Sequence, residues 1–284
     1  MKKSIVLLVQ NIVLLFSISS ITFTQAWIPL GSDSICVVVG VGQSNMVGWN
    51  FTTTDTARDS RVLAWNDAAA WVIADLQENP FNGNNNFLYH LGKRIAETYD
   101  IEVRIIKDAY GGKRIGFWVE DGTSSLYWTT LQHKITSSGI NEVDAFLVHH
   151  GEANSNSTIS AYADSINMLI SQARDSVDWS SQTMPIIFGE LHGWGYIPLT
   201  AYQNFFYDDI EFYVNDTFVT VAKLKNLEAD NSNVHFTGES LVIGGRYRYY
   251  EAILKLFPCI NGSIVYNTST GKFNFCENGI WVEK

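Results

Sequence analysis

The chain has 284 residues, of which 46% are hydrophobic and 17% are charged, and it carries 29 acidic against 19 basic residues. This length suits one large or two small domains with a sizeable core. The apolar content excludes a disordered chain, and the acidic balance excludes a basic nucleic-acid binder. Three cysteines are too few for a disulfide-dense miniprotein. We therefore expect an acidic globular protein with no nucleic-acid partner.

The first 26 residues have the pattern of a secretory signal peptide. Lys2 and Lys3 precede a largely apolar stretch, 5–23, and Thr24-Gln25-Ala26 supplies the small residues of a cleavage site. We expect cleavage after Ala26 and a secreted protein. The mature chain would then keep 17 basic and 29 acidic residues, a net charge of −12. The alternative is an uncleaved anchor, because the stretch is close to the length that spans a bilayer, and a membrane would be a partner only in that case.

Apolar runs typical of strands alternate with helical patterns through the middle of the chain. The expected strands are 35–41, 103–109, 145–149 and 185–189, and the expected helices are 86–98, 125–137, 158–177, 200–214 and 239–257. Near-continuous apolar strands that alternate with helices indicate a parallel sheet covered on both faces. We predict an α/β fold, a three-layer α/β/α sandwich with a central parallel sheet, whose sites lie at the carboxyl ends of the strands.

The last residues break this pattern. Short β-type runs around turns in 258–284 predict a small C-terminal β-hairpin appendix, and a strand pair packed on the main domain is the alternative. Export would permit a disulfide between Cys259 and Cys276, whereas Cys36, inside an apolar run, is expected to be a buried free thiol. The expected domains are thus a signal peptide over 1–26, a main domain over 27–257 and the appendix over 258–284.

Polar blocks follow the expected strands. The first strand ends in Gly42-Gln43-Ser44-Asn45-Met46, where a serine on a tight turn is a candidate nucleophile that needs a base and an oxyanion hole. Asn45 excludes a dinucleotide-binding fingerprint, and Met46 excludes the Gly-x-Ser-x-Gly nucleophile elbow. The later blocks are Tyr110-Gly111-Gly112-Lys113-Arg114, His149-His150-Gly151-Glu152 and Asn233-Val234-His235. No set of His, Cys, Asp or Glu residues in the sequence has the spacing of metal ligands, and we expect no cofactor.

These blocks, in this order, resemble the SGNH hydrolase superfamily, and more closely its sialate O-acetylesterase and carbohydrate esterase family 6 branch. The intact Gly-Gln-Ser-Asn-Met block at 42–46 carries most of the resemblance, which covers roughly 34–257. It implies an SGNH-type, flavodoxin-like fold for the main domain. It also implies a serine esterase that removes O-acetyl groups from carbohydrates such as sialic acid or an acetylated polysaccharide.

The resemblance also assigns roles by position. Ser44 would be the nucleophile and His235 the general base. The backbone N–H groups of Ser44 and Gly112, with the His150 side chain, would form the oxyanion hole, and Gly111 is the alternative backbone donor. Glu152 is expected to be a hydrogen-bonding hub rather than an acid. The other supporting residues are Gln43, Asn45 and Gly111, and the residues on the substrate side are Lys113, Arg114 and Trp118.

Two positions depart from the family pattern. The family has Gln where this chain has His150, and it has Asp three residues before the catalytic histidine where this chain has Ser232. Asp230 is the candidate replacement for that acid, and otherwise Ser44 and His235 would form a dyad. Losing the acid weakens catalysis without abolishing it. The alternative functions are a glycan-binding or attachment protein with a degenerate esterase site, and an esterase of non-sugar esters.

Overall fold

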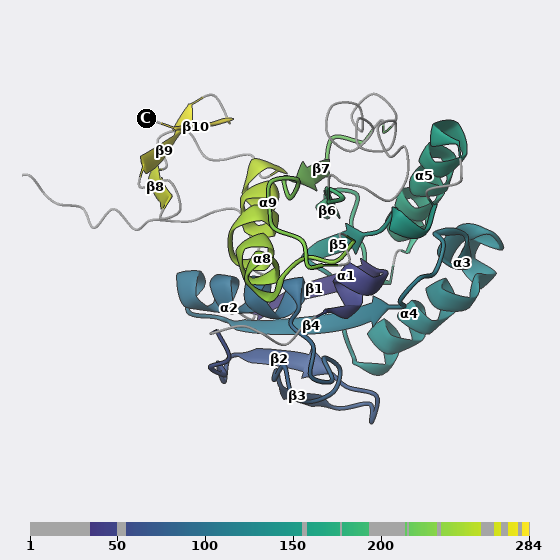
Figure 1. Ribbon diagram of the computed structural model, residues 1–284, viewed down its shortest axis with the longest axis horizontal. Helices are drawn as coiled ribbons and strands as arrows, with labels where there is room; N and C mark the ends of the chain where they lie inside the picture. The colour runs from purple at the N-terminus through teal and green to yellow at the C-terminus, as the bar shows by residue number, and fades with distance from the viewer. Residues whose placement is uncertain are drawn as a thin grey trace, which may run out of the picture.

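A seven-stranded sheet lies at the centre of the molecule. The computed structural model describes residues 35–49, 55–154, 158–176, 178–192, 214, 216–231 and 234–256, and the backbone of 264–267, 272–277 and 280–283. The strand order is β3-β2-β4-β1-β5-β6-β7 (Figure 1). The strands are β1 (Ile35–Gly42), β2 (Val62–Trp65), β3 (Trp71–Ile73), β4 (Glu102–Ala109), β5 (Ala145–His149), β6 (Ile186–Gly189) and β7 (Val219–Ala222). All neighbours pair in parallel except β3, which runs antiparallel to β2 at one edge.

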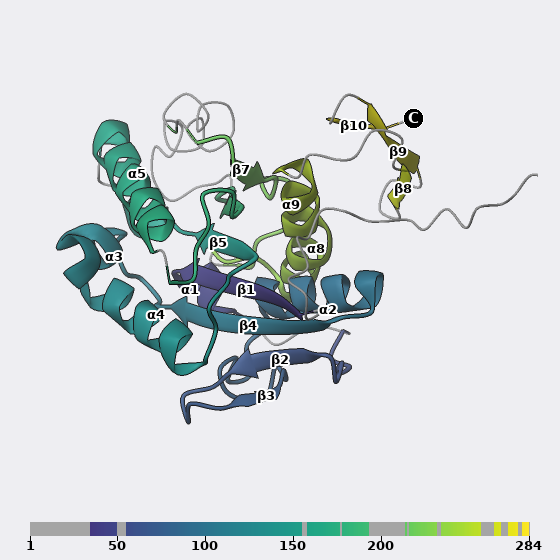
Figure 2. The same cartoon turned by 180° about the vertical axis from the view of Figure 1, so that it is seen from behind.

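Helices cover both faces of this sheet (Figures 1 and 2). One face carries α2 (Phe87–Tyr99), α8 (Gly238–Ile243), η4 (Gly244–Tyr249) and α9 (Tyr250–Leu256), and the other carries α3 (Gly116–Val119), α4 (Leu126–Ser137) and α5 (Ile159–Asp175). The short turns are α1 (Ser44–Val47), η1 (Gly122–Ser124) and η2 (Glu152–Asn154). The predicted three-layer α/β/α sandwich is therefore confirmed.

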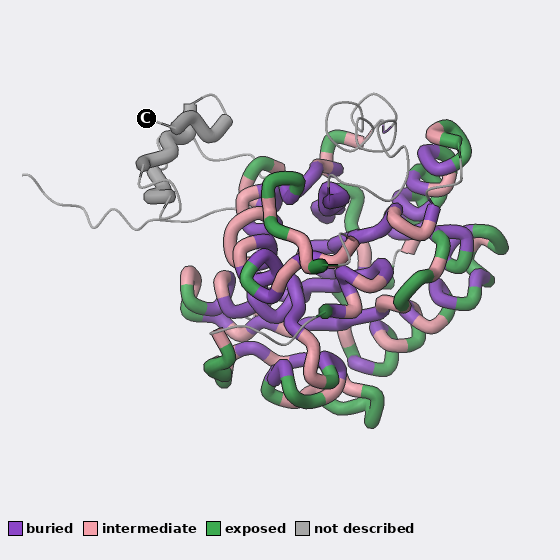
Figure 3. Tube along the Cα trace, in the orientation of Figure 1, coloured by how far each residue is buried: buried purple, intermediate pink, exposed green. Residues whose placement is uncertain are grey.

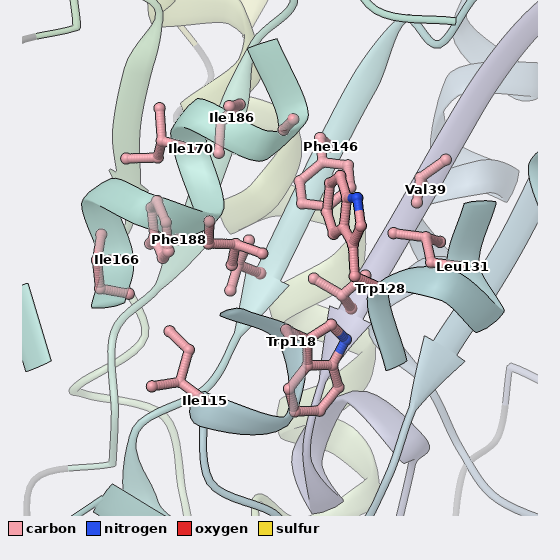
Figure 4. Packing of buried hydrophobic residues seen from close by; sticks show 14 of the residues in the cluster. Val39, Ile115, Trp118, Trp128, Leu131, Phe146, Ile166, Ile170, Ile186 and Phe188 are labelled. Atoms are coloured by element: carbon pink, nitrogen blue, oxygen red, sulfur yellow. The ribbon is translucent and has the colours of Figure 1, made fainter. Parts of the chain in front are cut away.

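Alternating side chains of the central strands fill two separate apolar layers. Val39 of β1 packs with Trp128 of α4 and Phe146 of β5 on one face (Figure 4), whereas Val38 packs with Leu88 of α2 on the other. These side chains are fully buried, and Figure 3 shows the same buried core along the trace. Because both faces of β1 are covered, its sequence is apolar at nearly every position, which is the pattern expected for a buried parallel strand.

The four predicted strands correspond to β1, β4, β5 and β6. The strands β2, β3 and β7 were not predicted, because each has only three or four residues, too few to show a period. The strand β6 is equally short, but Pro185 before it and Gly189 at its end mark its bounds. The predicted helix 200–214 lies outside the described residues except for Val214. The predicted helix 239–257 is observed over 238–256, where its middle turn, η4, is wound as a π-helix.

In the tail, the described backbone forms β8 (Ile264–Asn267), β9 (Lys272–Glu277) and β10 (Ile280–Glu283), which pair antiparallel in the order β10-β9-β8. We expected a two-stranded hairpin here. Cys259 and the side chain of Cys276 lie outside the described part, so their disulfide stays a prediction. Cys36 is the buried free thiol that was expected, and burial raises its pKa well above the usual value.

No helix in the described part of the chain is long and apolar enough to cross a membrane. The predicted signal peptide, 1–26, lies outside that part. Its cleavage and the domain boundaries that follow from it stay predictions.

Candidate functional site

Ser44 stands where β1 ends and α1 begins. Gly42 has φ +148°, and a Cβ at this position would lie 2.1 Å from the carbonyl oxygen of His149. Only glycine therefore lets the end of β1 approach β5 so closely. The Gln43 N–H donates to that same His149 oxygen at 3.1 Å. Because Ser44 is the first residue of α1, its N–H lies where a helix leaves backbone donors without an intrahelical acceptor.

The turn that carries Ser44 is fixed from α2 and β4. The Asn86 amide donates to the carbonyl oxygens of Met46 and Val47, at 2.6 and 3.1 Å. Lys107 of β4 donates through Nζ to the Val47 oxygen at 2.8 Å. Burial, followed by the charge of Lys134, lowers the pKa of Lys107 to about 8. These bonds satisfy the last carbonyls of α1, so the nucleophile candidate is attached to two rigid elements.

Glu152 holds the two residues on either side of Ser44. Its carboxylate accepts hydrogen bonds from the Gln43 amide and from Asn45 Nδ2, the latter at 2.7 Å, and lies 3.3 Å from His149 Nε2. Burial raises the pKa of Glu152, but the opposing charge of His149 and these hydrogen bonds outweigh it and bring the pKa to about 2. The group is therefore an ionised acceptor at neutral pH, in the hub position that was expected of it.

Asn45 joins the Ser44 turn to the segment that carries His235. Its Nδ2 donates to the carbonyl oxygen of Val234 at 3.0 Å, and its Oδ1 accepts from the N–H of Phe236 at 3.1 Å. One side chain thus binds the residues on both sides of His235, although 189 and 191 positions separate them from Asn45 in sequence. This amide therefore ties the turn that carries Ser44 to the segment that carries His235.

The structure also brings Asp230 to the His235 segment. The Asp230 N–H donates to the His235 carbonyl oxygen at 2.8 Å, and Ala229 and Phe236 form an antiparallel bridge. The Asp230 carboxylate accepts a hydrogen bond from the indole N–H of Trp49 at 2.8 Å. That indole is stacked on the His235 ring, with centroids 4.2 Å apart and planes at 17°. Trp49 therefore contacts both the Asp230 carboxylate and the His235 ring.

The loop after β4 presents backbone N–H groups. Gly111 and Gly112 are exposed, and Gly112 has φ +66°, a conformation that favours glycine. Nothing lies within 4 Å of a Cβ built at either position, so backbone conformation rather than crowding explains the glycine at 112. The loop is tied to β5 and η2, because His150 Nε2 bonds the Lys113 carbonyl oxygen at 2.8 Å and the Asn154 side chain accepts from the Ile115 N–H at 3.0 Å.

Two predicted roles need correction. The carbonyl oxygen of Lys113 can only accept a hydrogen bond. His150 Nε2 therefore carries the ring hydrogen and donates it to this oxygen. Burial lowers the pKa of His150 to about 4, which leaves the ring neutral and Nδ1 without a hydrogen. His150 is therefore not the oxyanion donor that was predicted but a tether of the glycine loop. Trp118 is 1% exposed and packs edge-on against His150, so it belongs to the core and not to the substrate side.

The other two substrate-side residues lie on the surface. Arg114 is exposed, and Lys113 Nζ lies 5.3 Å from the ring centroid of Phe117. Sequence reasoning missed Trp49, because a single tryptophan after a turn resembles any partly exposed aromatic residue. It also missed Asn86, whose side chain caps α2 while it binds the serine turn. No group of three or more His, Cys, Asp or Glu side chains that could hold a metal ion occurs among the described residues.

The comparison with protein families decides the class of this site. Residues 34–255 match the family model of the carbohydrate esterases described as sialic acid-specific acetylesterase. The chain belongs to this family. It is a carboxylic ester hydrolase, as the serine, glycine and histidine blocks predicted. None of the curated proteins matches the chain.

Solved structures share the fold of this esterase. A protein from Arabidopsis thaliana superposes with a TM-score of 0.61 at 19% identity, over 78% of this chain and 98% of the other. A carbohydrate acetylesterase from Xanthomonas citri gives 0.56 at 16% identity, over 84% of this chain and 62% of the other. The protein NanS superposes with a TM-score of 0.55 at 13% identity, over 78% of this chain and 97% of the other. At these identities the likeness concerns the fold alone, and it agrees with the observed α/β/α sandwich.

Proposed function

We propose that this esterase removes O-acetyl groups from carbohydrates through an acyl-enzyme on Ser44, with His235 as the general base. The observation that carries the proposal is the Asn45 amide, which binds both neighbours of His235 from the residue next to Ser44. Nucleophilic catalysis by serine needs a base held within reach of the hydroxyl. The family match and the names of the Xanthomonas citri structure and of the family model support an acetylated sugar as the substrate.

The geometry supports a two-step reaction. Ser44 Oγ attacks the acetyl carbonyl carbon while His235 takes the hydroxyl proton. The N–H groups of Ser44, at the start of α1, and of Gly112 donate to the oxyanion of the tetrahedral intermediate. The C–O bond to the sugar then breaks, and His235 returns the proton to the sugar oxygen. A water molecule, deprotonated by His235, attacks the Ser44 ester and releases acetate.

Removing the nucleophile tests this mechanism. We expect Ser44→Ala to lower the kcat for p-nitrophenyl acetate and for an O-acetylated sugar by roughly 1,000-fold or more, because the covalent step is lost. Ser171→Ala on the exposed side of α5 is the matched control, and it should keep full activity. Turnover in Ser44→Ala equal to that of the wild type would refute the mechanism.

A labelling experiment separates the esterase from a binding protein with a degenerate site. A fluorophosphonate probe should form a covalent adduct with the wild type at Ser44 and none with Ser44→Ala. Glycan binding without any labelling would favour the alternative function. The presence of Ser232 where the family has Asp supports that alternative.

We propose as well that residues 1–26 direct the esterase out of the cell. The support is the order of lysines, apolar stretch and small residues at the N-terminus. In a secreting host, the protein recovered from the medium should begin at Trp27. Recovery of the intact N-terminus from the membrane fraction would indicate the uncleaved anchor.

A further inference from the structure

Trp49 is placed against the proposed catalytic base. It stands five positions after Ser44, and its indole lies parallel to the His235 imidazole at a centroid distance of 4.2 Å. Its N–H donates to Asp230 at 2.8 Å. The side chain is 42% exposed, so it is not simply part of the core. Neither the family blocks nor the mechanism above gives this contact a role.

The indole is held in place by elements outside the loop. The backbone N–H of Trp49 donates to the Asn85 carbonyl oxygen at 3.2 Å, and the fully buried Asn85 side chain donates to the Gly238 oxygen at the start of α8 at 2.6 Å. Gly48 has φ +105°, and a Cβ there would lie 2.5 Å from the same Asn85 oxygen. Glycine at 48 thus lets the chain close onto Asn85 and turn the indole toward His235.

The chemistry of this contact fits the charge that His235 gains. An imidazole that accepts the serine proton becomes a cation, and the face of an indole ring attracts a cation. A carboxylate that accepts the indole N–H bond raises the electron density of the ring and adds its own negative charge nearby. Two acidic groups belong to the network around this contact, because Asp230 accepts from the indole N–H and Glu152 accepts from Asn45, whose amide binds both neighbours of His235.

We propose that Trp49 is a positioning residue for His235, which fixes the plane of the imidazole and stabilises its protonated form in concert with Asp230. The inference rests on the proposed function, in which His235 is the base. In this arrangement Trp49 and Asp230 together perform the task that the family gives to one acid, at whose position this chain has Ser232. Asp230 is then linked to the base by an aromatic ring.

Two substitutions separate the contributions of the ring and of its N–H group. Trp49→Phe keeps an aromatic face and loses the bond to Asp230, whereas Trp49→Leu loses both. Trp71→Phe on β3 is the matched control, because its indole N–H also donates one hydrogen bond, to Ser138 at 3.1 Å, three strands from β1. Thermal unfolding of each variant checks that the fold is kept.

We expect Trp49→Leu to have a kcat roughly 3- to 10-fold below that of Trp49→Phe, with a KM changed less than about twofold, because a cation–π contact at a half-buried site is worth about that factor. NMR titration of His235 should show a pKa lower in Trp49→Leu than in Trp49→Phe by roughly half to one pH unit, and the acid limb of the kcat/KM profile should move with it. Trp71→Phe should match the wild type in all three measurements.

Equal kcat and equal His235 pKa in Trp49→Phe and Trp49→Leu would overturn the inference. An increase in KM alone would also overturn it, because it would assign Trp49 to substrate binding. The NMR titration needs no turnover, so the two hypotheses can fail separately. A wild type without esterase activity refutes the proposed function, while the His235 pKa still decides the role of Trp49.

Discussion

At the scale of single residues, Asn45 has the largest structural role in the site. Its amide N–H groups donate to the Glu152 carboxylate and the Val234 carbonyl, and its oxygen accepts from the Phe236 N–H. The side chain is fully buried. No other residue type of this size offers two N–H donors and an acceptor in that arrangement. The contacts with Glu152 and with the segment around His235 therefore require asparagine at position 45.

Asn45→Asp tests this role with almost no change in volume. The substitution replaces the amide nitrogen, which carries both donors, by a carboxylate oxygen that would face the Glu152 carboxylate and the Val234 carbonyl oxygen. We expect a loss of about 3 kcal/mol in the free energy of unfolding and a kcat lower by roughly 100-fold, because His235 is displaced. Urea unfolding and acetate release measure the two effects. Asn66→Asp in an exposed turn, where only the side-chain oxygen is used, should change neither.

At the scale of elements, the carboxyl end of β5 organises the site. His149 accepts the Gln43 N–H through its carbonyl oxygen, and its ring lies between Glu152 and the hydroxyl of Tyr249 in η4. His150, the next residue, holds the glycine loop after β4 through the Lys113 carbonyl. Adjacent side chains of a strand point to opposite faces of the sheet. One strand end therefore fixes the serine turn on one side and the glycine loop after β4 on the other.

The buried His150 predicts a pH dependence of stability. Burial lowers its pKa in the folded state from the usual 6.5 to about 4. Between these values the unfolded chain binds more protons, so the contribution of His150 is complete above pH 6.5 and is lost as the pH falls toward 4. The loss amounts to about 3 kcal/mol. His150→Gln should abolish this pH-dependent loss. The difference in the free energy of unfolding between variant and wild type should therefore change between pH 6.5 and 4.

Urea unfolding at several pH values measures that difference. Burial also raises the pKa of Asp144 to about 7, so the contribution of Asp144 to the stability of the fold increases as the pH falls. The difference between the two proteins removes this contribution, because both contain Asp144. His133→Gln, at an exposed position of α4, is the control and should follow the wild-type curve. A constant difference between His150→Gln and the wild type from pH 7 to 4 would contradict the assignment of a neutral, buried ring.

At the scale of the whole molecule, the parallel sheet assembles the site from distant segments. The ends of β1, β4 and β5 lie side by side in the order β4-β1-β5, with Gly42 in register with Ala109 on one side and with His149 on the other. Sequence patterns locate these three ends well, because buried parallel strands are apolar throughout. The short strands at the edges and the π-wound turn of η4 give no such signal.

The sequence by itself determined the fold class, the central strands, the family and the order of the glycine, serine and histidine blocks. These features depend on local composition and on spacing along the chain. The tertiary structure alone decided what each side chain contacts. It turned His150 from a predicted donor into a tether, buried Trp118, and brought Trp49 and Asp230 to His235. The physical reason is that hydrogen-bond partners and burial depend on segments far apart in sequence, 37 positions for His150 and Lys113 and 181 for Trp49 and Asp230, whose approach the folded core sets.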